Sequence, residues 1–464
     1  MSSTSFLRLA LALAPLGLLT PAAHAQFASG NIVVVRIGDG AAALSGSAQA
    51  VFLDEFTPTG TLVRSVPMPV AANGNHLPMT NSGTATSEGL LNVSGDGHYL
   101  VAGGYAAIPG TPSVAGTASA SVGRVIARID LNGTTDTTTA ITNAFSAGNI
   151  RSVASSDGLQ FWAAGSNSGI QYTTLGVGAA VALNTVAPTN NRVVNIYAGQ
   201  LYTSTASGAF QGISTVGVGL PVTGGQTITI LPGFPTATGP SSYDYFFADP
   251  NTLYVADDRA NINGGIQKWT QSGGTWTLQY TLNPATNVGC RGLTGIVSGG
   301  VATLFATTTQ TSANQIVSVV DSGAGSIFNP VATAGVNTVF RGLRLIPALG
   351  NIARNVTGCG PTTITTTGEP RIGGSVTTTL GNLAGAPLIG LGFTMLGLPF
   401  CGSCAIGHEW RFVVVGASTG AISIPNDPTL IGGQVGFQGV DVFGTGGCAS
   451  PQVTLTDTMV VTIG

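Results

Sequence analysis

The fold of this chain is decided by residues 243–269, which read YDYFFADPNTLYVADDRANINGGIQKW. Three runs within it, 243–247, 252–256 and 265–269, are rich in the aromatic and β-branched residues that are enriched in strands. Asp-Pro-Asn separates the first two runs, and a polar loop that ends in Gly264 separates the second and third. The stretch therefore predicts three consecutive antiparallel strands joined by short turns.

The same pattern recurs along most of the chain. Neighbouring candidate inner strands are separated by 41, 52, 47 and 50 residues, counted from the residue that opens each one: Arg151, Arg192, Asp244, Arg291 and Arg341. Repeats of about 40 to 50 residues are typical of β-propeller blades, each of which is a four-stranded sheet. Because Glu88 opens an earlier and longer unit, we expect six blades, or seven if residues 71–141 contain another.

The two ends of this region are expected to pair. The last repeat supplies only one strand, residues 341–347, before the pattern stops. Three strand-like runs, 31–37, 49–53 and 61–66, lie near the start of the chain. If they complete the last blade, the ring closes and no sheet edge stays exposed. The sequence thus predicts an all-β fold, with a propeller over residues 26–350 closed by its N-terminal strands.

Two motifs resemble known propeller repeats. The sequence LYVADD at 253–258, followed by GIQKW at 265–269, resembles the NHL-type repeat, although it lacks that repeat's polar-basic step before the Ile-Gln pair. The Ser-x-Asp-Gly turns at 94–97 and 155–158 resemble the YVTN type, and glycine there accepts the positive φ of a tight hairpin. The resemblance implies the fold alone, because propellers carry many unrelated functions.

Composition argues against a nucleic-acid partner. Of the 464 residues only 7% are charged, the formal net charge is -3, and Lys268 is the single lysine. Binding to a polyphosphate requires a basic stripe or patch, and this sequence has none. Nucleic acid is therefore not an expected partner.

The N-terminus predicts export. Arg8 precedes an apolar run at 9–19 and then Ala23-His24-Ala25, the small-x-small pattern of a signal peptidase site, so residues 1–25 are expected to be a signal peptide. The later apolar run at 383–400 contains two prolines and four glycines, which favours strands over a membrane-spanning helix. We expect an extracellular or periplasmic protein with no membrane span.

From residue 351 to 464 the repeat disappears and short strands dominate, which suits a small β-sandwich. The run at 424–432, followed by Gln434 and Phe437, resembles the C-terminal sandwich module appended to many exported bacterial proteins. The stretch 372–408 has no charged residue. A docking or structural role is expected for this module.

Four of the five cysteines lie in the C-terminal region. The preferred pairing is Cys359 with Cys448, closing the module end to end, and Cys401 with Cys404 as a tight local loop. A Cys-x-x-Cys pair is also compatible with a redox or zinc half-site. Cys290 is left over and expected to be buried.

The charged residues that open the inner strands are the candidate ligand-binding site. Arg151, Arg192, Arg291 and Arg341 occupy equivalent positions, joined by Glu88 and Asp244. In a closed ring they would face one mouth of the central channel and could hold an anionic or polyhydroxylated ligand through bidentate guanidinium hydrogen bonds. The alternative is structural: the arginines pair with Glu88, Asp244 and backbone carbonyls to fasten the strand ends.

Catalytic patterns are weak. Only three histidines follow residue 25, and the G-x-S-x-G string at 416–420 is followed by strand-like residues instead of the helix that a nucleophile elbow requires. We therefore expect a non-enzymatic propeller that binds a glycan or surface protein at the channel mouth or blade loops, with no cofactor. The alternatives are a metal-assisted hydrolase or lactonase using Glu88 and Asp244, and a structural component of an extracellular layer.

Overall fold

The computed structural model describes residues 26–285, 288–348, 350–368, 370–372, 374–425, 430, 432–449 and 452–464. The predicted signal peptide, residues 1–25, lies outside these ranges, as does most of the 424–432 run. The named elements of the described chain are β-strands and the 3-10 turn η1 (Val114–Gly116), joined by turns and loops. None of the described residues belongs to a helix long and apolar enough to cross a bilayer.

Four sheets in the first part of the chain are four-stranded antiparallel meanders in which spatial order follows sequence order. Their strands are β9 (Ile150–Ser155), β10 (Gln160–Gly165), β11 (Gln171–Thr174), β12 (Val181–Ala182); β13 (Val194–Tyr197), β14 (Gln200–Ser207), β15 (Phe210–Val216), β16 (Ile228–Ile230); β17 (Ser242–Asp249), β18 (Thr252–Asp257), β19 (Gly265–Ser272), β20 (Thr275–Leu282); and β21 (Cys290–Ser298), β22 (Val301–Thr308), β23 (Gln315–Val320), β24 (Phe328–Thr333). The three strands expected within residues 243–269 are β17, β18 and β19.

A nine-stranded sheet contains two further meanders, joined by β4 (Thr80–Ser82). One consists of β5 (Leu91–Val93), β6 (Tyr99–Tyr105), β7 (Arg124–Asp130) and β8 (Thr135–Ile141). The other consists of β25 (Val339–Leu345), β1 (Ile32–Ile37), β2 (Ala48–Phe56) and β3 (Leu62–Pro67). β25 pairs antiparallel with β1, placing Ile32 opposite Leu345. The N-terminal strands therefore complete the sheet that the last repeat begins, as the sequence predicts.

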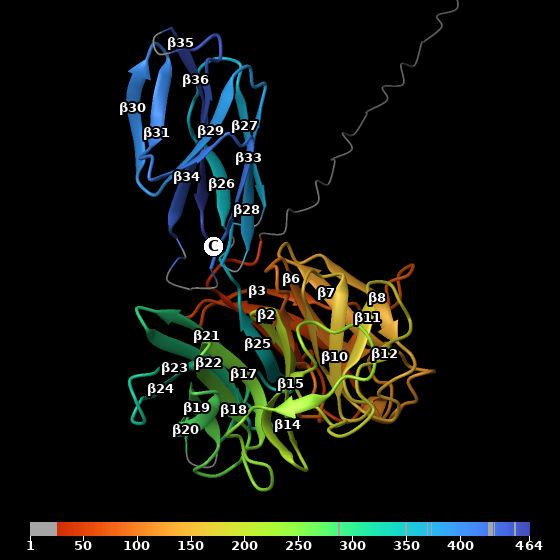
Figure 1. The fold of residues 1–464 in the computed structure, drawn as a ribbon. Helices are drawn as coiled ribbons and strands as arrows, with labels where there is room; N and C mark the ends of the chain where they lie inside the picture. The colour runs from red at the N-terminus through yellow and green to blue at the C-terminus, as the bar shows by residue number, and fades with distance from the viewer. Residues whose placement is uncertain are drawn as a thin grey trace, which may run out of the picture.

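These sheets are arranged in a propeller-like ring, the lower part of Figure 1. The first strand of each meander is the inner one, and β17 contacts β21, β21 contacts β25, β25 contacts β5, and β5 contacts β9 around the axis. The apolar core is divided among the interfaces between sheets. Val101 and Ile126 of one sheet, for example, pack with Val153 and Phe161 of the next.

The hairpin turns within the ring have the expected backbone geometry. Gly97 and Gly158 close the turns between β5 and β6 and between β9 and β10, with φ of 77° and 73°. A side chain at such a position would be strained, so the Asp-Gly pairs determine where these hairpins reverse.

The C-terminal strands form separate sheets, the upper part of Figure 1. One has the order β26 (Asn351–Val356), β36 (Gln452–Thr462), β34 (Gln434–Val442), β29 (Ala386–Gly392), β32 (Phe412–Val415), with β35 (Cys448–Ala449) beside β36; a second contains β27 (Thr363–Gly368), β28 (Ser375–Gly381) and β33 (Thr419–Ser423); a third is the hairpin of β30 (Met395–Cys401) and β31 (Cys404–His408). Val376 of the second sheet packs with Ile389, Phe437 and Val461 of the first in one buried cluster. Residues 383–400 form strands, in agreement with the sequence.

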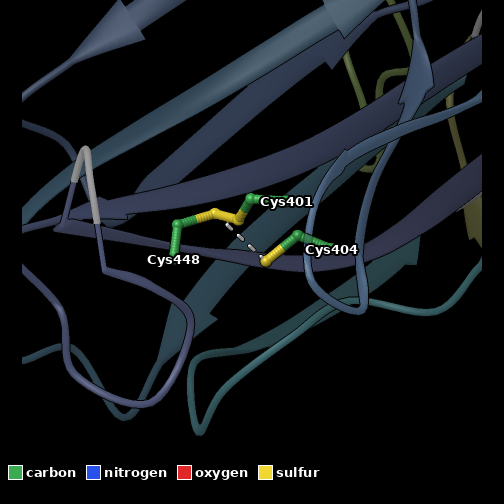
Figure 2. A group of neighbouring side chains, drawn as sticks. All are labelled: Cys401, Cys404 and Cys448. Atoms are coloured by element: carbon green, nitrogen blue, oxygen red, sulfur yellow. Dashed lines mark hydrogen bonds between the residues drawn. A yellow bond between two sulfur atoms is a disulfide. The ribbon is translucent and has the colours of Figure 1, made fainter.

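The predicted disulfide pairing is wrong. The structure joins Cys359 to Cys404 and Cys401 to Cys448. Cys401 and Cys404 face each other across the β30–β31 hairpin, but each bonds to a cysteine on another segment, and Figure 2 shows Cys448 bonded to Cys401 with Cys404 alongside. The hairpin is therefore fastened to the rest of its unit at two points. Cys290 is free and buried, as expected.

Candidate binding site at the channel mouth

The four predicted arginines lie where the inner strands begin, and we call them the arginine ring. Arg151 is the second residue of β9, Arg291 the second of β21 and Arg341 the third of β25, whereas Arg192 precedes β13 by two residues. We call the end of the channel at which these strands begin the mouth.

Each ring arginine donates one hydrogen bond to a backbone carbonyl. The Nη1 atoms of Arg151, Arg192 and Arg291 bind the carbonyl oxygens of the following residues: Asn191 at 3.0 Å, Ser242 at 3.0 Å and Thr309 at 3.3 Å. Arg341 Nη2 binds the Gly83 carbonyl at 3.2 Å. Asn191 and Ser242 lie just before or at the start of the next meander, so the bonds from Arg151 and Arg192 join neighbouring sheets. Bonding to backbone carbonyls is what the structural alternative expects of these arginines.

Tyr243 and Asp258 lie among the ring arginines. The Arg192 guanidinium carbon lies 4.0 Å from the centre of the Tyr243 ring, and that of Arg291 lies 5.6 Å from it. Asp258 is 3.3 Å from Arg291 Nη2 and 3.9 Å from Arg192 Nη1. The two guanidinium groups therefore share one aromatic face contact and one carboxylate.

Burial and neighbouring positive charge lower the pKa of two ring arginines, Arg341 and Arg151. Arg341 is only 5% exposed, and burial together with the nearby charge of Arg291 lowers its pKa to about 10. Burial also lowers the pKa of Arg151, and the charge of Arg192 adds to this effect. The charge of Arg192 therefore acts on Arg151, and that of Arg291 acts on Arg341.

Glu88 lies near the ring but binds other residues. Its buried carboxylate accepts hydrogen bonds from the Tyr105 hydroxyl at 2.5 Å, the Ser82 amide at 2.8 Å and the Asn149 side-chain amide. Burial raises the pKa of Glu88 despite these donors. In the described part of the chain it forms no salt bridge with a ring arginine, so its predicted pairing with them is absent there.

Asp244 is placed on the channel axis, away from the arginine ring. Its carboxylate is fully buried and binds Arg344 through Nη1 at 2.5 Å and Nη2 at 2.9 Å. Tyr243, one residue earlier in β17, contacts the ring instead. The offset of one residue moves the side chain to the opposite face of the strand.

Arg344 and Asn92 complete a network across the axis. Arg344 of β25 also donates to the Leu293 carbonyl of β21 at 2.7 Å and to Asn92 Oδ1 of β5 at 2.5 Å. The Asn92 amide donates to the carbonyls of Val153 in β9 and Val194 in β13, at 2.6 and 2.9 Å. Together with Asp244 of β17, the axial network binds all six inner strands and crosses the channel below the mouth.

Sequence reasoning missed Arg344 and Asn92. Arg344 lies in the predicted strand 341–347, where only Arg341 was considered as a candidate, and Asn92 is a single polar residue among the apolar residues Leu90, Leu91 and Val93. A usable indication was available, because a charged residue in the middle of an inner strand must find a partner near the axis.

The carboxylates required by the hydrolase alternative are already engaged. The Glu88 and Asp244 oxygens accept hydrogen bonds from protein donors, and a calcium-type site needs several free oxygen ligands around one point. Within the described residues, the only close group of three potential metal ligands consists of Cys401, Cys404 and Cys448, which take part in the two disulfides. All four carboxylate oxygens of Glu88 and Asp244 thus already accept hydrogen bonds from the protein.

Comparison with solved structures finds distant likenesses. YCF48 bound to a D1 peptide is 12% identical, with coverage of 68% of this chain and 88% of that chain and a TM-score of 0.35. A fungal alcohol oxidase of the AA5 family in complex with copper is 10% identical, with coverage of 95% and 98% and a TM-score of 0.39. The extracellular domain of BT4673 from B. thetaiotaomicron is 10% identical, with coverage of 93% and 59% and a TM-score of 0.35.

At these identities and TM-scores, none of the three likenesses bears on the ligand or activity of this chain. No protein-family model matches the sequence. No curated protein matches it either.

Proposed function

We propose that this protein is an exported, non-enzymatic binding protein. It consists of a six-bladed β-propeller over residues 26–350 and a C-terminal β-sandwich over residues 351–464, and it binds an extracellular glycan or protein at the channel mouth. The blade number is supported by the six four-stranded meanders found among the described strands, and the sandwich by the buried cluster shared between two sheets.

The observation that carries the binding proposal is the state of the ring arginines. Each guanidinium group is fixed by a carbonyl, yet Nη2 of Arg151, Nη2 of Arg192 and Nη1 of Arg341 have no hydrogen-bond partner within the described chain. Donors that are fixed in place before a ligand arrives lose little conformational entropy on binding. The mouth is therefore preorganised to accept oxygen atoms from a ligand.

Export is supported by the two disulfides, because structural disulfides persist mainly in oxidising compartments. The sandwich has a docking or structural role in this proposal. Its hairpin β30–β31, fastened at both cysteines, supplies a rigid surface for that role.

The binding proposal is tested by screening purified protein against an array of extracellular glycans and against surface-protein extracts. We expect a ligand whose binding falls by at least about tenfold in Arg192→Ala, because a charge-assisted hydrogen bond contributes about 1.5–3 kcal/mol. Arg128→Ala is the matched control, since Arg128 pairs with Asp136 on neighbouring strands β7 and β8. Equal loss in both variants, or binding unaffected by Arg192→Ala, would count against the mouth as the site.

A second role, as a packing component of an extracellular layer, is favoured by one feature. All four residues of β32, at the edge of the six-stranded sheet, are apolar and exposed, with Val415 at 75%. Exposed apolar edge strands pair readily with other chains. Light scattering should then show ordered self-assembly that Val415→Lys abolishes, whereas a monomer at all concentrations would exclude this role.

A further inference from the structure

The charge around the mouth is unbalanced. Four guanidinium groups of the arginine ring face two carboxylates, Asp258 and Glu88. The neighbouring Asp244 and Asp257 are each neutralised by an arginine of their own, Arg344 and Arg259. At least two positive charges at the mouth are therefore uncompensated, even when Glu88 is ionised.

The unused donors of the ring are partly buried. The Nε atoms of Arg151, Arg291 and Arg341 are inaccessible to solvent and have no hydrogen-bond partner among the described residues. Arg341 is 95% buried by area, and its side chain forms one hydrogen bond within the described chain, to the Gly83 carbonyl. A buried cationic group with unsatisfied donors is costly, and an acceptor anion drawn into the mouth would remove part of that cost.

The arginine ring is partly accessible to solvent on one side and is followed along the inner strands by the axial network. Arg192 and Arg291 keep 20% and 15% of their side-chain surface exposed. Arg344, three residues after Arg341 on β25, belongs to the axial network, so the network lies about 10 Å further along the strand. A ligand can therefore reach the Arg192 and Arg291 guanidinium groups from solvent, whereas the axial network crosses the channel beyond them.

The side chains beside the ring are polar. Asn190 accepts a hydrogen bond from Arg151 at 2.6 Å, and Ser241 accepts one from Arg192 at 2.9 Å. Planar guanidinium groups surrounded by amide and hydroxyl groups suit an oxygen-rich ligand.

From these observations we propose that the arginine ring binds the carboxylate or sulfate group of an acidic carbohydrate. This inference rests on the binding function proposed above and specifies its ligand class. The oxyanion accepts hydrogen bonds from the unpartnered nitrogens of Arg151, Arg192 and Arg341, while Tyr243 supports the Arg192 guanidinium from one side.

The test compares four probes by calorimetry with the intact protein: trigalacturonic acid, its fully methyl-esterified form, a sulfated disaccharide and an acidic peptide. We expect one or both acidic saccharides to bind, with affinity that falls as salt is raised, and the methyl ester to bind at least about tenfold more weakly. Arg192→Ala should reduce binding similarly. Arg151→Lys, which keeps the charge but loses the planar fork, should give an intermediate loss.

The outcomes separate the two proposals. Equal binding of the acid and its methyl ester, unaffected by the arginine substitutions, overturns the anion inference and leaves a glycan-binding function standing. Binding of the acidic peptide alone overturns the carbohydrate assignment. If Arg192→Ala does not fold, the anion inference is decided by the binding of Arg151→Lys and of the methyl ester. Absence of binding to all four probes at low salt overturns the anion inference, and failure of the glycan and protein screen as well overturns both.

Discussion

Arg344 and Asp244 are the buried charges that hold the inner strands together. Their ion pair is nearly inaccessible to solvent, with side-chain exposures of 8% and 0%, and it lies where all six inner strands approach one another. A buried pair of this kind gains little over an apolar replacement of the same shape, but losing one partner leaves an uncompensated charge. The pair therefore serves mainly to fix the relative positions of the inner strands around the axis.

Replacing one member of this pair should be severe and replacing both should be mild. Arg344→Met is expected to lower the free energy of unfolding by about 3–5 kcal/mol, because Asp244 stays buried without its cation. The double variant Arg344→Met/Asp244→Leu should recover most of that loss. Urea unfolding measures both, and a single variant as stable as the parent protein would refute this role.

At the scale of elements, closure of the ring depends on the close approach of β25 to β5. The Gly342 amide donates to the Gly89 carbonyl at 3.0 Å. A Cβ atom at position 342 would lie 2.4 Å from the Leu91 amide nitrogen and 2.6 Å from Leu90 Cα. Backbone atoms cannot move aside as a flexible side chain does, so glycine is required here by packing.

Gly342→Ala should therefore destabilise the ring by about 1–3 kcal/mol, the usual cost of overpacking. Gly325→Ala is the matched control, because a Cβ there meets nothing within 4 Å and the backbone does not have positive φ. Thermal unfolding compares the two. Equal melting temperatures would mean that the strands separate easily and that closure is looser than described.

The disulfide connectivity gives a second prediction at this scale. Cys404→Ser should leave Cys359 as the new free thiol, detected by alkylation of the denatured, non-reduced chain and peptide mapping. Loss of this disulfide, whose cysteines are separated by 45 residues, should lower the free energy of unfolding by about 4 kcal/mol according to the chain-entropy relation. Cys290→Ser is the control for the existing free thiol. Alkylation of Cys401 in place of Cys359 would contradict the observed connectivity and support the Cys401–Cys404 pairing expected from the sequence.

For the molecule as a whole, His408 predicts a pH dependence confined to the C-terminal unit. It is fully buried, its Nε2 atom has no partner within the described chain, and burial lowers the pKa of its imidazole below the usual 6.5. The unfolded chain therefore takes up a proton near pH 6.5 that the folded unit does not. Stability contributed by neutral His408 is present above this pH and declines as the pH falls below it.

Calorimetry between pH 7.5 and 5 should show the unfolding transition of the C-terminal unit moving to lower temperature, with a smaller movement in His408→Gln. Glutamine does not titrate in this range, so the variant is the direct control. An identical pH slope in both proteins would assign the effect to other groups.

Much of the ring was predictable because its determinants are local. Alternating apolar residues, Asp-Gly turns and regular spacing predicted β17 to β19, the pairing of the chain ends and the arginines at the inner-strand starts. The Arg344–Asp244 pair was not predictable in this way, because it joins residues 100 positions apart and only the closed ring brings them together. The predicted cysteine pairing was wrong because Cys401 and Cys404, although they lie opposite each other in the β30–β31 hairpin, each bond to a cysteine on another segment. Sequence proximity alone does not show which distant cysteines the fold brings to the hairpin.

The central claim, that the arginine ring binds the ligand, is tested most directly by phenylglyoxal footprinting of the intact protein. Modification rates are compared by mass spectrometry with and without saturating trigalacturonic acid. The account predicts that Arg192 and Arg291 become severalfold slower to react, while Arg354, whose side chain is 60% exposed in the C-terminal unit, is unchanged. Unaltered rates at Arg192 and Arg291 while calorimetry shows the saccharide bound would contradict it.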